Sequence, residues 1–90
     1  MIVLFSDLAK REVQDAADFL DVEADGLGTA FEHDVQRSAT LISRYPAAGA
    51  IERPGVRRVL LQKFYSIEDD HILVIAVAHQ RRRPDYWIDR

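Results

Sequence analysis

The stretch that decides the fold runs from Asp69 to Trp87 and reads DDHILVIAVAHQRRRPDYW. Its apolar part, Ile72–Ala78, follows an acidic turn and is separated from three arginines and a proline by His79 and Gln80 alone. A run this short and rich in β-branched residues is typical of a strand covered on both faces rather than of a helix. The sequence therefore predicts a buried strand at the middle of a sheet, with a cationic segment at its end.

Working outward, the composition is that of a single globular domain spanning residues 1–90, with 48% hydrophobic and 30% charged residues. The chain contains no cysteine, which excludes disulfides and thiolate metal ligands. The apolar run Met1–Phe5 lacks a basic segment before it and is too short to span a membrane. These features predict a cytoplasmic protein without a membrane partner.

The net charge of −3 hides an uneven distribution along the chain. Residues 1–52 carry ten acidic and four basic side chains, whereas residues 53–90 carry five acidic and eight basic ones. If the second half forms a sheet, part of its surface is locally cationic and can attract a polyanion. The alternative is a solvated rim of arginines on an acidic protein.

The first half of the chain predicts a strand followed by two helices. Ile2–Phe5 is apolar and β-compatible, and Ser6 or Asp7 can cap the helix that follows. Apolar residues then recur at three- and four-residue spacing from Leu8 to Ala24, which predicts an amphipathic helix.

Two glycines, Gly26 and Gly28, can end this first helix, and Thr29 is the expected cap of the next one. The second helix is expected from about Thr29 to Arg44 and stops before Pro46. Because the connection is short, the two helices should be antiparallel neighbours.

The second half reads as β structure. Residues 47–50 and 54–55 are expected to be irregular, Val56–Ile67 is β-like, and Glu68–Asp70 forms a turn before the buried strand. The predicted fold is α+β: an N-terminal strand and an antiparallel helical hairpin packed on a small, mainly antiparallel sheet.

Three segments together resemble the RelE/ParE family of bacterial toxins. They are the break Tyr45–Gly49, the strand Val56–Leu60 and the terminal run His79–Trp87, which reads HQRRRPDYW. The resemblance covers nearly the whole chain, and it implies the toxin of a type II toxin–antitoxin module that is held inactive by a cognate antitoxin.

The chain departs from the family pattern between Phe64 and Ile67, where the segment before the acidic turn is shortened. The third strand is therefore expected to be lost or cut to a stub, since three residues span only about 10 Å. The shortening would either fuse Val56–Ile67 into one long strand or leave an edge of the buried strand exposed. It also raises the hypothesis of an inactive relative that only binds antitoxin.

The resemblance implies two modes of toxicity. ParE-like members bind and poison DNA gyrase, and RelE-like members cut mRNA on the ribosome. The second mode would use catalytic residues together with cations that stabilise the phosphate, and the first would use cationic and aromatic residues that bind the target. The catalytic candidates are His79, Arg82 and Tyr86, and the binding candidates are Arg58, Lys63, Arg81, Arg82, Arg83 and Trp87.

Cations at these positions are sparse for an RNA-binding site and the chain is acidic overall, so the gyrase-directed mode is favoured over the ribonuclease. The three histidines show no metal-ligand spacing, and no phosphate-binding glycine loop is present, so no metal or cofactor is expected.

Structural roles compete with each functional one. His79 can simply bond a neighbouring carbonyl, and Tyr86 and Trp87 can cover the sheet or contact an antitoxin. Arg57 and Arg58 alternate across the strand, so one of them is expected to pair with a helix acid, Asp15 or Asp18.

Apolar residues off the buried stripe of the first helix, Phe19 and Val22, predict that the isolated chain requires an antitoxin or a second copy of itself.

Overall fold

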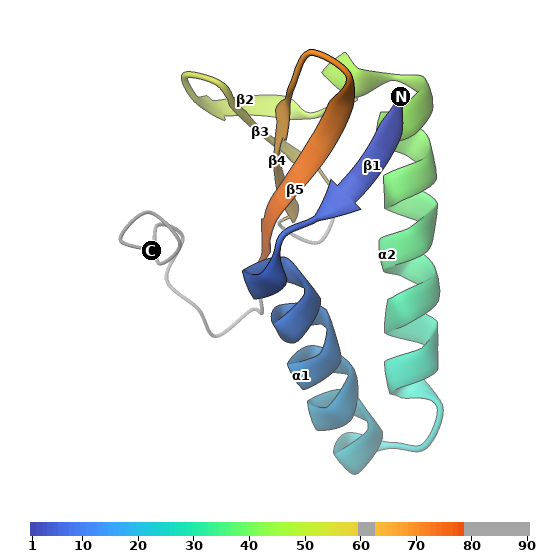
Figure 1. Cartoon of the computed structure of the whole chain (residues 1–90). Coiled ribbons are helices and arrows are strands. Elements are labelled where there is room, and N and C mark those ends of the chain that lie inside the picture. The colour runs from blue at the N-terminus through green and yellow to red at the C-terminus, as the bar shows by residue number, and fades with distance from the viewer. Residues whose placement is uncertain (60–62, 79–90) are drawn as a thin grey trace.

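The computed structural model describes residues 1–59 and 63–78. A helical hairpin packs against one mixed sheet of five strands in this part of the chain, which confirms the predicted α+β class (Figure 1). In chain order the elements are β1 (Ile2–Phe5), α1 (Asp7–Glu23), α2 (Leu27–Arg44), the 3-10 turn η1 (Pro46–Ala48), β2 (Ala50–Arg53), β3 (Val56–Val59), β4 (Lys63–Ile67) and β5 (His71–Val77).

The sheet has the strand order β1-β5-β4-β3-β2, with β1 parallel to β5 and every other pair antiparallel. The buried strand predicted at Ile72–Ala78 is confirmed as β5, in which Ile72 and Val74 are fully buried. β5 has a hydrogen-bonded neighbour on each side, but β4 occupies the middle of the sheet. The prediction of a central β5 is therefore wrong in this detail, because three strands lie on one side of it and only β1 on the other.

The strand β2 was not predicted, since residues 47–50 were expected to be irregular. Ala50 instead begins a strand that pairs with β3 through Ala50–Arg58 and Ile51–Arg57. Gly55 adopts a φ of 77° and closes this hairpin. All four residues of β2 are exposed. Because neither face of the strand is buried, its sequence lacks the alternation of apolar and polar residues by which a strand is predicted.

Neither expectation for Val56–Ile67 holds. The segment forms two antiparallel strands, β3 and β4, rather than one long strand. β4 pairs with β5 from Lys63–Val77 to Ile67–Ile72, so it is no stub, and β1 covers the other edge of β5. Lys63 and Phe64 are the first two residues of β4.

The helices begin and end close to the predicted positions. Ser6 is the N-cap of α1, as expected, and its Oγ accepts a hydrogen bond from the Ala9 amide at 3.0 Å. The cap of α2 is Gly26, with a φ of 89°, rather than Thr29, so the helix begins at Leu27. Pro46 follows directly after α2 and its cap, as predicted.

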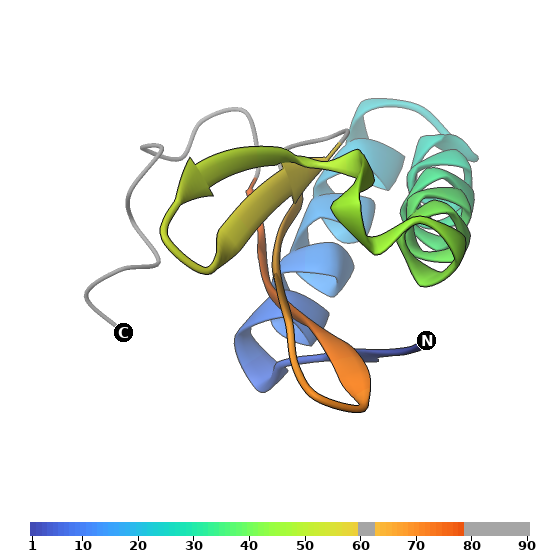
Figure 2. The same ribbon diagram turned by 90° about the horizontal axis from the view of Figure 1, so that it is seen from above.

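Both helices lie on the same side of the sheet (Figure 2). The larger cluster of buried side chains lies between the helices and the sheet and is formed by Ala9, Ile42, Val59, Tyr65, Ile72, Val74 and Val77. A second cluster is centred on Phe64, Ala76 and Ala78. The predicted helical hairpin and its packing on the sheet are thereby confirmed.

The backbone of β5 changes its bonding partners halfway along the strand. β1 pairs with residues 71–74 and then ends. Beyond that point Ser6 Oγ donates a hydrogen bond to the Ile75 carbonyl at 2.7 Å, and a Glu12 carboxylate oxygen accepts one from the Val77 amide at 3.1 Å. Side chains at the start of α1 thus complete the strand where β1 stops, which is necessary because buried backbone groups without partners are costly.

β5 also contains a bulge in its pairing with β4. Tyr65 pairs with Val74 and Phe64 with Ala76, so Ile75 is an extra residue in β5. The bulge moves Ala76 and Val77 onto opposite faces from those that strict alternation after Val74 would give. The bulge therefore decides which cluster each residue joins: Val77 lies in the first cluster and Ala76 in the second.

We expect Ser6→Ala to lower the free energy of unfolding by about 2 kcal/mol, because it removes a helix cap and leaves the Ile75 carbonyl without its partner. Urea unfolding measures the change. Ser6→Thr retains the hydroxyl and should recover most of the loss. Ser66→Ala is the matched control at an exposed hydroxyl bond to Glu68, where a change within about 0.5 kcal/mol is expected. Equal effects of Ser6→Ala and Ser66→Ala would contradict the assignment.

Candidate target-binding site

The strand register brings two of the predicted binding residues, Lys63 and Arg58, to one end of the sheet. Lys63 in β4 lies opposite Val77, the last residue of β5, and Arg58 in β3 lies opposite Phe64. The chain leaves β5 at this end, after Ala78. The remaining candidates follow Ala78 in sequence and lie outside the described residues: His79, Arg81, Arg82, Arg83, Tyr86 and Trp87.

Lys63 is not on the surface. Its side chain is 0% exposed, and its Nζ donates hydrogen bonds to the Val35 carbonyl at 2.7 Å and to Ser38 Oγ, both on α2. The Nζ also lies 5.6 Å from the centre of the Phe5 ring. The predicted role of Lys63 in binding an external phosphate does not fit this position, since the residue instead ties β4 to α2.

Burial lowers the pKa of Lys63 from 10.5 to about 8 by desolvating the ammonium group. The group therefore remains mostly charged at neutral pH and keeps its charge inside the helix–sheet interface. Hydrogen-bond acceptors and the Phe5 ring offset part of the cost of burying it.

Arg57 also has a structural position. It lies opposite Tyr65, and its guanidinium donates a hydrogen bond to the Gly49 carbonyl at 2.9 Å. The Tyr65 hydroxyl donates to the Pro46 carbonyl at 2.7 Å and accepts from the Gly49 amide at 2.9 Å. The two side chains hold the connection between α2 and β2 against the sheet.

This arrangement corrects the expected pairing of one of the two arginines with Asp15 or Asp18. Arg57 bonds to backbone carbonyls, and Arg58 forms an ion pair with Glu52 of β2 at 3.2 Å. The reason is that β2, which the sequence reasoning missed, supplies a closer acid than the helix does.

Arg58 is the predicted binding residue that reaches the surface within the described part of the chain. Its side chain is 46% exposed and lies opposite Phe64, which belongs to the buried cluster that includes Ala76 and Ala78. Arg58 can therefore contact a partner at the end of β5, although Glu52 offsets its charge. An exposed ion pair of this kind contributes little to stability, so Arg58 can leave Glu52 and pair with an anionic group of a partner instead.

A pair of polar side chains lies at the opposite end of β5. His71 Nδ1 is 2.7 Å from an Asp70 carboxylate oxygen, and this hydrogen bond lowers the pKa of Asp70. Within residues 1–59 and 63–78, no group of His, Cys, Asp or Glu side chains could hold a metal ion.

The family is decided by a comparison with protein-family models. The model described as "ParE toxin of type II toxin-antitoxin system, parDE" matches residues 3–84. The chain belongs to the ParE toxin family. It is thus the toxin of a type II toxin–antitoxin system, and an antitoxin is its partner. A search of curated proteins found no match.

At the end of β5 lies one buried polar residue that the sequence reasoning missed. Glu12 is only 8% exposed and binds the Val77 amide. Glu12 is three residues from Ala9 and four from Ala16, so it lies on the buried stripe of α1, and this spacing could have revealed its burial.

Among the described residues of this ParE-family chain, neither helix has the length and apolar character that a membrane span requires.

We expect the free energy of unfolding to rise between pH 8 and pH 10.5 because of Lys63. In this window the unfolded chain holds a proton that the folded chain has released, so folding is favoured as pH increases. The full contribution is about 3 kcal/mol at most. Lys63→Met should remove this rise, since the thioether does not titrate and packs in the same volume.

Urea unfolding of both proteins at several pH values measures the difference. Lys10→Met, on the exposed side of α1, is the matched control and should follow the parent profile. Parallel profiles for the parent chain and Lys63→Met would show that the lysine does not titrate in this window.

Proposed function

We propose that this toxin inhibits growth by binding DNA gyrase, with the end of β5 and the segment that follows it as the contact surface. The ParE family match over residues 3–84 carries the proposal. The contact residues proposed are Arg58, Arg81, Arg82, Arg83 and Trp87.

The positions of the described cations support this mode over RNA cleavage. A ribonuclease site needs cations that are free to stabilise a developing phosphate charge. Lys63 is buried under α2, and Arg57 is bonded to the Gly49 carbonyl, so neither is available for that purpose. Arg58 is paired with Glu52. The described end of the sheet is thus better suited to a protein surface than to an RNA backbone.

The hypothesis of an inactive relative loses its motive. It was based on a third strand reduced to a stub, whereas β4 pairs with β5 from Lys63 to Ile67. β5, which precedes the segment after Ala78, is paired with β1 on one side and with β4 on the other.

The purified chain should inhibit gyrase supercoiling and increase gyrase-dependent DNA cleavage at micromolar concentration. Replacing Arg81, Arg82 and Arg83 together by alanine should weaken the inhibition at least tenfold, because the cationic segment is removed. Arg37→Ala, an exposed cation on α2 paired with Asp34, is the matched control and should leave inhibition unchanged.

The ribonuclease alternative predicts different results. His79→Ala and Tyr86→Phe would then abolish toxicity, and primer extension on translated mRNA would show cuts at codons. If gyrase does not respond at micromolar toxin while such cuts appear, the gyrase proposal is wrong. Growth arrest in induced cells that lack antitoxin should occur in either case.

A further inference from the structure

We propose that Glu12 is a positioning residue for the target contact. Its carboxylate holds Val77, the last residue of β5, so that the cationic segment after Ala78 starts from a fixed point. This role rests on the proposed function for the place of the contact, and on the hydrogen bonds around Val77 for the part that Glu12 takes in it. Glu12 itself makes no contact with the target in this proposal.

Glu12 is a charged residue on a helix face that is otherwise apolar. It is 8% exposed and shares the buried stripe of α1 with Ala9 and Ala16. Burial of a carboxylate is costly unless it accepts hydrogen bonds, and one of its oxygens accepts from the Val77 amide at 3.1 Å. A leucine at this position would pack without that cost but would leave the amide without its acceptor. The carboxylate is therefore explained by the strand and not by the packing of the helix.

The Val77 amide depends on Glu12 because of the direction in which it points. Its hydrogen is directed toward α1, so it does not point toward β4, which pairs with the opposite edge of β5. β1 is on the same side as α1, but its pairing with β5 covers residues 71–74 and ends before this point. A side chain of α1 thus takes the place of a neighbouring strand at the end of β5.

A second buried side chain fixes the position opposite Val77. Lys63 pairs with Val77 in the register of β4 and β5, and its Nζ donates to the Val35 carbonyl of α2 at 2.7 Å. One side of the end of β5 is thereby bonded to α1, and the strand on its other side is bonded to α2. The position of Val77 therefore follows that of the helical hairpin.

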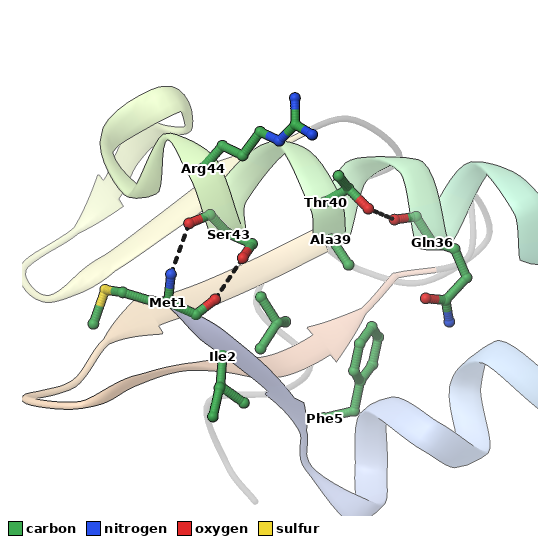
Figure 3. Close-up of a pocket in the computed structure, with 9 residues that line it drawn as sticks. Met1, Ile2, Phe5, Gln36, Ala39, Thr40, Ser43 and Arg44 are labelled. Carbon is green, nitrogen blue, oxygen red and sulfur yellow. Dashed lines mark hydrogen bonds between the residues drawn. The ribbon is translucent and has the colours of Figure 1, made fainter.

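The hairpin is itself fixed to the sheet. The Gly28 amide donates to an Asp21 carboxylate oxygen at 2.8 Å, which ties α2 to α1. At the other end of α2, the Met1 amino group donates to the Ser43 carbonyl at 2.9 Å, and the Ser43 hydroxyl donates to the Met1 carbonyl (Figure 3). These bonds lie beside a groove of about 570 Å³ between β1 and α2. Glu12 therefore ties the end of β5 to a helix that does not shift independently of the sheet.

The bond at Val77 lies close in sequence to the proposed contact residues, since Arg81 follows Val77 by four residues. Without the carboxylate, the last residues of β5 can open locally while the rest of the sheet stays folded. Target binding must then order these residues as well. The apparent affinity falls in proportion to the fraction of molecules in which the end of the strand is formed.

Amide hydrogen exchange measures the local opening. Glu12→Leu removes the acceptor and retains a side chain of similar size with high helix propensity. Exchange should accelerate about tenfold more at Val77 than at Ile72 or Val74, which lie earlier in β5. Glu12→Gln retains an uncharged oxygen, which is a weaker acceptor than a carboxylate, so its effect should lie between those of the parent chain and Glu12→Leu.

Gyrase inhibition by the purified toxin, and growth arrest by toxin induced to matched levels, measure the positioning. Glu12→Leu should need about fivefold more folded toxin for half-maximal inhibition, and Glu12→Gln should be intermediate. Ser6→Ala is the matched control, because it removes a side-chain bond to Ile75, on the same edge of β5 but two residues before Val77. At equal amounts of folded protein it should inhibit as the parent chain does.

Three results would overturn the positioning role: parent-like potency of Glu12→Leu, equal losses of potency in Glu12→Leu and Ser6→Ala, or uniform acceleration of exchange along β5. If Glu12→Leu does not fold, Glu12→Gln carries the same comparisons with Ser6→Ala. A parent toxin that arrests growth without inhibiting gyrase would refute the proposed function, and growth arrest would still test Glu12. The two failures are therefore distinguishable.

Discussion

The structure depends on hydrogen-bond partners for the backbone on both edges of β5, a strand in which Ile72, Val74 and Ala76 are fully buried. β4 pairs with one edge, and β1 pairs with the first half of the other. At Ile75 and Val77 the partners become Ser6 and Glu12. The start of α1 therefore acts as the continuation of β1, which fixes how the helical hairpin sits on the sheet.

The same constraint fixes the end of the sheet where we propose the target contact. Glu12 bonds the Val77 amide at the last residue of β5, so the strand leaves the sheet at a defined point. Lys63 fixes the neighbouring position in β4 by bonding to α2. If the proposed contact is correct, a fixed end of β5 reduces the ordering that is needed on binding.

The two edges of the sheet have different chemistry, and this difference suits a protein with more than one partner. β2 carries charged residues, while β1 has none. A toxin that is controlled by an antitoxin requires a surface that another chain covers in the inactive state. Ile2 and Leu4 of β1 are exposed apolar residues of the kind that such a surface contains.

The sequence by itself determined the α+β class, β5, both helices and the family. These features rest on local signals: the apolar run at residues 72–78, the helical spacing in each half of the hairpin, and Pro46. Only the tertiary structure decided that Lys63 is buried, that Glu12 completes β5 and that β2 exists. Each of these depends on which backbone atoms of distant segments meet, and a lysine or glutamate has the same sequence pattern whether its head group reaches water or a buried amide.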